Sequence, residues 1–465
     1  MNPIYDVILV GGGVGGIFAA YELLKCRPQL RVALLEQGQE IRQRSCPILD
    51  KKAASCISCP ICAIMRGFGG AGAFSDGKFN FTTQFGGWLN EYLPDQQVME
   101  LIEYVDQINQ KFGATSQFFS TESPEADLIR RQAIGYDLYL LNARCKHLGT
   151  DNNRDILSAQ FKYLKERLDL YCGIQVINIS PAGQTGYHLE TSGGDFDCRR
   201  LIVAPGRSGA EWFSGQCRKL GLRLINNQVD IGVRVELPAI VFKSITDTVY
   251  EAKLHYRTKL YKDIVRTFCM NPYGYVVTEN TEGIITVNGH SFSDPARRSE
   301  NTNFALLVSN KFTFPFHEPY QYGKRIASLS NMLGGGVLVQ RFGDLINGRR
   351  TNDHRLEQSY VRPTLEATPG DLSLVLPKRH LDNIIEMIET LDKLAPGTAN
   401  HDTLLYGVEV KFYSSRLELN NELETKLPGL YAVGDGAGIT RGLAQAGASG
   451  VIAARSIIKK IANES

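Results

Sequence analysis

The residues with the clearest chemical pattern are glycines close to the amino terminus. Gly11-Gly12-Gly13-Val14-Gly15-Gly16 fits the spacing G-x-G-x-x-G and follows a short apolar run. Glycines at this spacing let the backbone approach a pyrophosphate, and the start of the following helix offers N–H groups to the anion. Glu36 stands 20 positions after Gly16, where an acceptor for ribose hydroxyls is expected. The pattern predicts a dinucleotide site that contains Gly11, Gly13, Val14, Gly15, Gly16 and Glu36.

A second glycine-rich segment extends from Gly67 to Lys78. Its end satisfies G-x4-G-K, the spacing of a nucleoside triphosphate loop, but Phe79 stands where that loop needs a hydroxyl for magnesium, and no strand pattern precedes it. We therefore interpret the segment as a backbone-rich loop that lies against a flat ring system. Its candidate binding residues are Gly70, Ala71, Gly72, Ser75 and Asp76, with Lys78 as a further polar group beside the ring.

A third segment near the carboxyl terminus carries the same kind of signal. Val433-Gly434-Asp435-Gly436 ends a short apolar run, and Gly442-Leu443-Ala444 opens the last predicted helix. An aspartate after a buried strand can hold a chain of hydroxyls, while a helix start can face a phosphate or a ring carbonyl. We expect this segment to bind the same elongated dinucleotide through Gly434, Asp435, Gly442 and Ala444.

Together with 203–209 (VAPGRSG) and 267–270 (TFCM), these motifs resemble the FAD-dependent dehydrogenase family often described as NAD(FAD)-utilising. The resemblance covers almost the whole chain. It implies FAD as the cofactor, an α/β fold with a Rossmann-like FAD-binding domain of the glutathione-reductase type, and a small-molecule substrate that the family does not specify. It implies that Gly11, Gly13 and Gly16 contact the diphosphate, that Glu36 holds the adenosine ribose, and that Asp435 lies on the flavin side; Ala204 and Gly206 complete the expected cofactor-binding set.

The chain departs from the family pattern at two places. Asn271 stands where a second cysteine is expected after Cys269-Met270, and His290 follows Asn288-Gly289 where methionine is usual. An imidazole titrates near pH ~6.5, so His290 becomes a candidate proton donor or base, with a structurally satisfied histidine as the alternative. For hydride transfer between a bound substrate and a flavin, the candidate catalytic residues are His290, Asp76 and Lys78.

The role of four cysteines is the main question that the sequence leaves open. Cys46, Cys56, Cys59 and Cys62 have the spacing C-x9-C-x2-C-x2-C, which resembles [4Fe-4S] ligation. A four-cysteine zinc site, a redox relay and plain structural thiols are the other interpretations. An iron-sulfur cluster would favour an alternative function, electron transfer through flavin and cluster without a substrate of the protein's own.

The pattern of apolar residues predicts the strands and helices that must position these residues. Residues 5–10 and 31–36 are predicted strands that flank a helix through 17–24, which is the strand–turn–helix–strand order of a dinucleotide fold. Helices are predicted at 98–112, at 156–168 with Asp151 or Asn152 as cap, and at 381–391; strands are predicted at 174–179, 187–191 and 200–204. Residues 226–375 alternate strands with Gly, Pro and Asn. We therefore predict an FAD-binding domain at 1–225 and 396–465, and an inserted β-rich substrate domain at 226–395.

Composition excludes several classes of partner. The chain has 465 residues, with 51 Lys plus Arg against 49 Asp plus Glu, so the net charge is +2 and no basic stripe is present. Nucleic acid binding, and with it flavin-dependent RNA modification, is therefore not expected. The longest apolar stretch has fourteen positions, short of the ~20 that cross a bilayer, and no signal-peptide pattern precedes it, so we predict no membrane span and a cytoplasmic location.

One dinucleotide fingerprint predicts one firmly bound dinucleotide. NAD(P)H or a protein is then a transient electron partner rather than a second resident cofactor. Among the scattered arginine pairs, Arg349 or Arg350 is a candidate for contact with an anionic substrate, whereas a solvated surface is the simpler interpretation.

Overall fold

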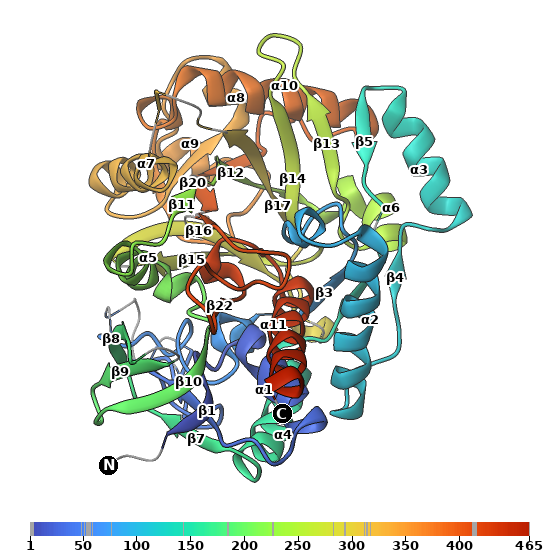
Figure 1. The fold of residues 1–465 in the computed structure, drawn as a ribbon. Coiled ribbons are helices and arrows are strands. Elements are labelled where there is room, and N and C mark those ends of the chain that lie inside the picture. The colour runs from blue at the N-terminus through green and yellow to red at the C-terminus, as the bar shows by residue number, and fades with distance from the viewer. Residues whose placement is uncertain are drawn as a thin grey trace. The chain divides into compact units, whose positions relative to one another are not determined.

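The computed structural model describes residues 4–47, 49, 50, 52, 57, 59–75, 77–142, 144–183, 186–225, 227–281, 283–292, 294–310, 312, 315, 316, 318–411 and 416–464. The chain forms two compact units. The first contains residues 1–118, 145–227 and 413–465, and the second contains residues 119–144 and 228–412. Figure 1 gives the order of the elements along the chain.

A seven-stranded sheet forms the centre of the first unit, with the order β7-β2-β1-β10-β9-β8 and β22 paired to β10. Strands β7, β2, β1, β10 and β22 are all parallel, whereas β10, β9 and β8 follow one another as antiparallel neighbours. Strands β1 and β2 are short and almost entirely buried, which is typical of parallel strands in a sheet covered by helices.

Segments from the two ends of the chain meet on this sheet. Helix α1 follows β1, and the last helix, α11, packs along it, as Figure 1 shows. The helices approach closely because Gly450 faces the backbone of Gly15, where a Cβ atom would overlap the carbonyl oxygen of Gly15. The amino-terminal and carboxyl-terminal glycine segments are therefore parts of one unit.

The elements of the first unit are β1 (Tyr5–Val10), α1 (Val14–Cys26), β2 (Val32–Glu36), η1 (Gly70–Phe74), β3 (Lys78–Phe81), η2 (Leu89–Glu91), α2 (Asp95–Lys111), β6 (Arg144–His147), α4 (Thr150–Lys165), β7 (Asp169–Cys172), β8 (Val176–Pro181), β9 (Tyr187–Thr191), β10 (Phe196–Val203), η3 (Arg207–Gly209), α5 (Ala210–Lys219), β11 (Leu224–Ile225), β21 (Arg416–Leu417), β22 (Leu430–Ala432), η6 (Asp435–Ala437) and α11 (Leu443–Glu464).

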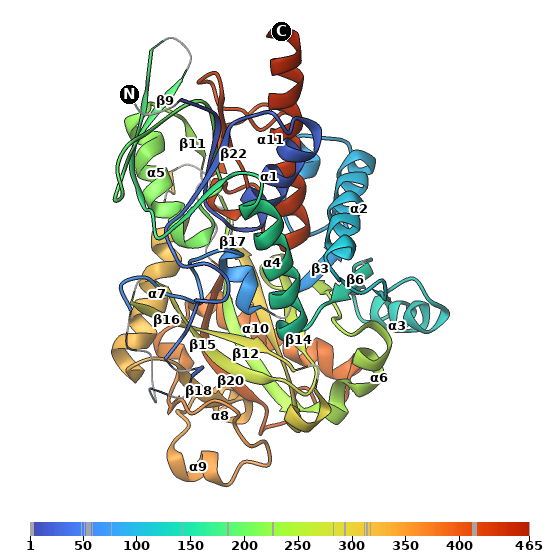
Figure 2. The ribbon, with the colours of Figure 1, turned by 90° about the horizontal axis from the view of Figure 1, so that it is seen from below.

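An eight-stranded sheet forms the centre of the second unit, with the order β19-β18-β20-β12-β17-β14-β13-β5. The long strands β12 and β17 pair antiparallel over ten residues. Helices α6 and α10 pack against β12 and β17, and α7 packs against β20 and against β16, the second strand of the hairpin β15–β16, as Figure 2 shows for α7 and β16. The apolar side chains of β12, β14 and β17 and those of α10 form the core of this unit.

The elements of the second unit are β4 (Phe119–Ser120), α3 (Pro124–Ile134), β5 (Leu138–Leu140), β12 (Val229–Pro238), α6 (Ala239–Val249), β13 (Leu254–Arg257), β14 (Ile264–Asn271), β15 (Tyr275–Thr281), β16 (Ile284–His290), η4 (Pro295–Arg297), β17 (Asn301–Asn310), α7 (Pro319–Gly334), β18 (Leu338–Arg341), α8 (Phe342–Ile346), α9 (Asp353–Glu357), β19 (Thr368–Pro369), η5 (Leu372–Leu374), α10 (Lys378–Leu394) and β20 (Leu404–Lys411).

The structure differs from the sequence-based prediction in two domain boundaries and in one helix cap. Residues 404–411, placed in the FAD-binding domain from the sequence, form β20, which pairs with β12 in the second unit. Residues 119–144 also join the second unit, because β5 pairs with β13. Helix α4 is not capped by Asp151 or Asn152. Its N-cap is Gly149, and both of these residues lie inside the first helical turn.

None of the described helices combines the length and the apolar character that a membrane crossing requires.

Candidate functional site

The glycine turn between β1 and α1 packs so tightly that two of its positions require glycine. Gly11 has a φ of +106°, and a Cβ atom there would overlap the carbonyl oxygen of Ala204. A Cβ atom on Gly16 would overlap the carbonyl oxygen of Gly11. The turn therefore lies directly against the end of β10, where the amide of Ala204 also donates to the carbonyl of Val10 over 2.8 Å.

The start of α1 has the character of an anion site. Gly13 is the N-cap, no side chain caps the helix, and the first turn contains no acidic residue. The N–H groups of the first turn of a helix have no partner within the helix, and the helix dipole places about +0.5 of a charge there. Val14, Gly15 and Gly16 supply these N–H groups.

Glu36 ends β2 and organises the backbone around the glycine turn. Its Oε2 accepts a hydrogen bond from the amide of Gly12 over 2.7 Å, and its Oε1 accepts from the amides of Gly38 and Gly67 over 2.8 and 2.9 Å. The residue is 5% exposed. One carboxylate thus ties together the glycine turn, the segment after β2 and the start of the second glycine-rich segment.

The second glycine-rich segment lies on the first. The amide of Gly69 donates to the carbonyl of Gly12 over 2.8 Å, and a Cβ atom on Gly70 would come within 3.2 Å of the Gly13 Cα. Gly70, Ala71 and Gly72 belong to the 3-10 helix η1. Ser75 follows it, and its Oγ donates to the carbonyl of Gly72 over 2.8 Å. Asp76 lies outside the described residues, and Lys78 begins β3.

Arg44 holds this segment in place, and sequence reasoning missed it. Its guanidinium donates to the carbonyls of Ala63, Ile64, Phe68 and Gly70 over 2.8 to 2.9 Å. The residue is 3% exposed, and burial lowers the pKa of its guanidinium to about 10. No local sequence signal separates Arg44 from surface arginines, because its partners are backbone carbonyls about 20 residues away in the chain.

The third segment, after β22, packs on the turn that follows β10. A Cβ atom on Gly436 would overlap the carbonyl oxygen of Gly206. The amide of Gly434 donates to Ser449 Oγ over 3.0 Å, and Thr440 Oγ1 donates to Asp435 Oδ1 over 2.6 Å. The half-buried Asp435 thus stands at the carboxyl end of the parallel strand β22, which pairs with β10. Ligands of open α/β sheets bind at this edge.

The segment from Gly442 to Ala444 begins α11 beside a loop that leads from β3. A Cβ atom on Gly442 would lie 3.6 Å from the Gly86 Cα, and the amide of Arg441 donates to the carbonyl of Gly86 over 3.0 Å. The Arg441 guanidinium also lies 3.7 Å from the ring centroid of Trp88. The three predicted glycine segments are therefore close together within the first unit, although they are up to about 430 residues apart in the chain.

His290 belongs to the second unit, where it ends β16. Its ring packs edge-on against Phe292, with the ring centroids 4.6 Å apart, and it also lies near Tyr275. Lys78 is in the first unit, and Asp76 lies outside the described residues. Their joint role stays a prediction.

The structure describes only three of the four cysteines of the predicted cluster. Cys46, Cys59 and Cys62 are free thiols of intermediate exposure, and Cys56 lies outside the described residues. Over the described part of the chain, no three His, Cys, Asp or Glu side chains are grouped closely enough to hold a metal ion. The iron-sulfur interpretation has no support from the described geometry.

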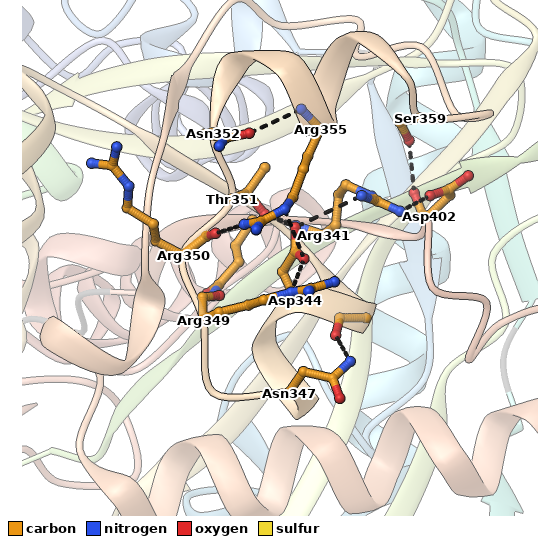
Figure 3. Close-up of polar contacts among 12 residues, drawn as sticks. Arg341, Asp344, Asn347, Arg349, Arg350, Thr351, Asn352, Arg355, Ser359 and Asp402 are labelled. Atoms are coloured by element: carbon orange, nitrogen blue, oxygen red, sulfur yellow. Dashed lines mark hydrogen bonds and ion pairs between the residues drawn. The ribbon is translucent and has the colours of Figure 1, made fainter.

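The candidate anion-binding arginines lie in the loop between α8 and α9. Arg349 Nε lies 2.7 Å from Asp344 Oδ1, and Thr351 Oγ1 donates to Asp344 Oδ2 over 2.8 Å. Figure 3 shows that Arg341 and Arg355 also point toward Asp344, whereas the side chain of Arg350 points away. Asp344 is 1% exposed. The arrangement therefore explains Arg349 as part of the loop's own packing.

Comparison with known proteins supports the predicted cofactor. Residues 228–412, the longer segment of the second unit, match the family model described as FAD-dependent protein, C-terminal domain-like. An uncharacterized protein of Clostridium beijerinckii is 26% identical over 474 residues, covering 97% of this chain and 80% of that protein. The family match confirms the prediction of an FAD-dependent protein.

Two further similarities are more limited. The mitochondrial L-2-hydroxyglutarate dehydrogenase of Dictyostelium discoideum is 51% identical over 40 residues, 9% of each chain. The crystal structure of a geranylgeranyl bacteriochlorophyll reductase-like protein from Thermoplasma acidophilum has a TM-score of 0.43 and 14% identity, covering 99% of this chain and 79% of that one.

Proposed function

We propose that this protein is an FAD-dependent oxidoreductase, with a first unit of the glutathione-reductase type, that transfers hydride between the flavin and a small organic substrate. The observation that carries the proposal is the convergence of three glycine segments at the carboxyl end of one parallel sheet. The family match over 228–412 supports FAD as the dinucleotide.

The residues of the first unit suit each part of FAD. The uncapped start of α1 suits a diphosphate, with Gly11, Gly13 and Gly16 keeping side chains away from it. Around Gly206 and Gly434, an added Cβ atom would meet no heavy atom within 4 Å, so the backbone there is open to a ligand. We assign the ribose of the adenosine to Glu36 and the hydroxyls on the flavin side to Asp435, which already accepts from Thr440.

FAD supplies a group that accepts or donates two electrons, and the chain supplies binding and proton handling. Gly70 to Ser75 are proposed to lie along the flavin, positioned by Arg44 and Glu36. His290, with Asp76 and Lys78, is proposed to hold or move the proton that accompanies hydride transfer. A partner that delivers or removes electrons, NAD(P)H or a protein, is proposed to bind transiently.

The test begins with the purified protein. We expect visible flavin absorption, release of FAD rather than FMN on acid precipitation, and about one FAD per chain. Anaerobic addition of NADH, NADPH and a panel of small hydroxy and amino acids should bleach the flavin with at least one of them. Protein that is colourless and takes up no added FAD would disprove the proposal.

The iron-sulfur interpretation of Cys46, Cys56, Cys59 and Cys62 is tested by a separate measurement. Metal analysis of protein purified without oxygen, together with the cysteine-to-serine variant of Cys59, tests whether iron is bound. Stoichiometric iron that is lost in the variant would revive the electron-transfer alternative. The proposed function predicts metal-free protein whose flavin content is unchanged in the variant.

A further inference from the structure

The first unit contains a small cavity where its three glycine segments meet. Val14 of the first segment, Gly72 of the second and Leu443 of the third line the cavity. The three residues pack together, because a Cβ atom on Gly72 would lie 2.9 Å from Leu443 Cδ2 and 3.6 Å from Val14 Cγ2. Side chains of α1, α2, α4 and β3 complete the wall. The cavity is therefore part of the surroundings of the proposed cofactor site.

The size of the cavity limits what it can hold. The centre of a water molecule has about 10 Å³ in which to lie. This is about the space that one ordered water needs in a protein interior. The cavity therefore has room for one molecule of that size.

The chemistry of the wall excludes an ion. Most of the lining side chains are apolar, among them Ile17, Phe79 and Leu157, and none of the described lining residues is charged. On α2, Asp106 already pairs with Lys146, whose Nζ lies 2.6 Å from Asp106 Oδ2. An ion in the cavity would have no counter-charge, which is costly in a protein interior. The ligand must therefore be neutral.

One polar group in the wall has an unsatisfied atom. Asn109 of α2 is 3% exposed, and its Oδ1 accepts from Gln160 Nε2 over 2.9 Å. Its Nδ2 makes no hydrogen bond to any of the described residues. A buried amide N–H group without an acceptor destabilises the fold, because it has lost its hydrogen bonds to water. Asn109 therefore calls for a further partner.

The ligand needs to donate as well as to accept hydrogen bonds. If the amides of Asn109 and Gln160 were both turned over, Asn109 would donate to Gln160, and the unsatisfied atom would be an acceptor. A molecule that both donates and accepts suits either arrangement. The third amide of the wall does not compete for it in the same way, because Asn153 Nδ2 already donates to the carbonyl of Gly72 over 2.7 Å.

We infer that this cavity binds one water molecule, which hydrogen-bonds to Asn109 and is a fixed part of the cofactor site. Water has the required size, carries no charge, and both donates and accepts. The water site itself is argued from the cavity and from Asn109. Its effect on FAD rests on the proposed function.

Loss of the water should disturb the cofactor site from behind. Atoms around an unfilled space lose packing contacts, so the wall tends to move inward. Val14 and Gly72 belong to this wall. They are also residues of the segments that are proposed to hold the diphosphate and the flavin. FAD should therefore bind less tightly when the water is lost.

A crystal structure of the FAD-loaded protein tests the water site without any variant. We expect density for one ordered water within hydrogen-bonding distance of the Asn109 amide. A cavity without density, or density for part of FAD in its place, would overturn the inference. An ordered water in crystals of colourless protein would support the water site and disprove only the proposed function.

Substitution then tests what the water does. Asn109→Leu combined with Gln160→Met replaces both amides by apolar side chains of similar size, so no buried amide atom is left without its partner. The double variant should lose the water and raise the Kd of FAD at least about tenfold. Gln107→Leu, at an exposed position of α2, is the matched control. It should keep the water and bind FAD within about twofold of the parent.

Two results with a folded double variant would contradict the inference. A water that stays in the cavity would show that Asn109 does not hold it. FAD affinity equal to that of the Gln107→Leu control, with the water lost, would show that the water is not part of the cofactor site. Circular dichroism and thermal unfolding establish that each variant is folded.

Discussion

Gly16 lies beneath Gly11 so closely that any side chain on Gly16 would occupy the place of the Gly11 carbonyl oxygen. Gly11 in turn leaves no room for a Cβ atom against Ala204. The start of α1, the glycine turn and the end of β10 therefore form one stack of backbone. The geometry of the proposed diphosphate site depends on this stack, and the Glu36 carboxylate adds a hydrogen bond to the turn at Gly12.

Gly16→Ala should consequently abolish tight FAD binding and lower the free energy of unfolding by about 1–3 kcal/mol, because the added methyl group must displace backbone. Gly215→Ala is the matched control, since Gly215 is inside α5 and an added Cβ atom there would meet nothing within 4 Å. The control should be neutral or more stable by up to about 1 kcal/mol. Flavin absorbance and thermal unfolding measure both effects. Normal FAD content in Gly16→Ala would contradict the proposed geometry.

Arg44 allows a separate test of how the second glycine segment is positioned. Arg44→Lys retains the charge but cannot reach four carbonyls in different directions, so buried acceptors lose their donors. We expect a loss of about 2–4 kcal/mol of stability and cleavage within residues 63–70 at low protease concentration. Arg42→Lys, at an exposed neighbour, should resist the protease as the parent does. Equal cleavage of the two variants would show that Arg44 does not hold the segment.

Glu36→Gln tests the carboxylate that ties three backbone amides together. The amide group that replaces one oxygen is a donor, and it would face the N–H of Gly12 or those of Gly38 and Gly67. Two donors facing each other should weaken FAD binding by about 1.4–2.8 kcal/mol, which is ten- to a hundredfold in affinity. Titration of the apoprotein with FAD measures the change. Glu40→Gln is the control, because the half-buried Glu40 pairs with Lys165 rather than with the glycine turn, and equal affinity in both variants would contradict the role of Glu36.

Local sequence patterns predict the first unit's cofactor-binding elements well. The strand predicted at 5–10 is β1 (Tyr5–Val10), and the strand predicted at 31–36 is β2 (Val32–Glu36). The reason is physical: a buried parallel strand needs an apolar run, and the tight turn after it needs glycine. Both requirements are visible within about ten residues.

Long-range pairing is what the sequence does not reveal. Leu254 of β13 pairs with Leu140 of β5, more than 100 residues earlier, and Val233 of β12 pairs with Gly407 of β20. The apolar alternation of these strands predicts a strand but not its partner. Arg44 was missed for a related reason, since its partners are backbone carbonyls, which any sequence provides.

His380 gives the second unit a dependence on pH. It is 3% exposed in α10, and its Nε2 lies 3.0 Å from Asn310 Nδ2, an amide donor. Nε2 therefore accepts, and the ring is neutral. Burial lowers the pKa of this imidazole from its ordinary 6.5 to about 4, the positive charge of Arg379 acts in the same direction, and Asp263 opposes them.

Because its pKa is lower in the folded state, His380 takes up a proton first in the unfolded chain as the pH falls below 6.5, so acid favours unfolding until about pH 4. Between pH 7 and pH 5 this effect amounts to about 2 kcal/mol. Urea unfolding measures how much the free energy of unfolding falls between pH 7 and pH 5. This fall should be smaller by about 2 kcal/mol in His380→Gln than in the parent. Carboxylates that titrate in the same range contribute equally to both proteins and cancel. His354→Gln, at an exposed histidine, should keep the parent's full pH dependence, and the same dependence in His380→Gln would show that this imidazole is not held neutral by the fold.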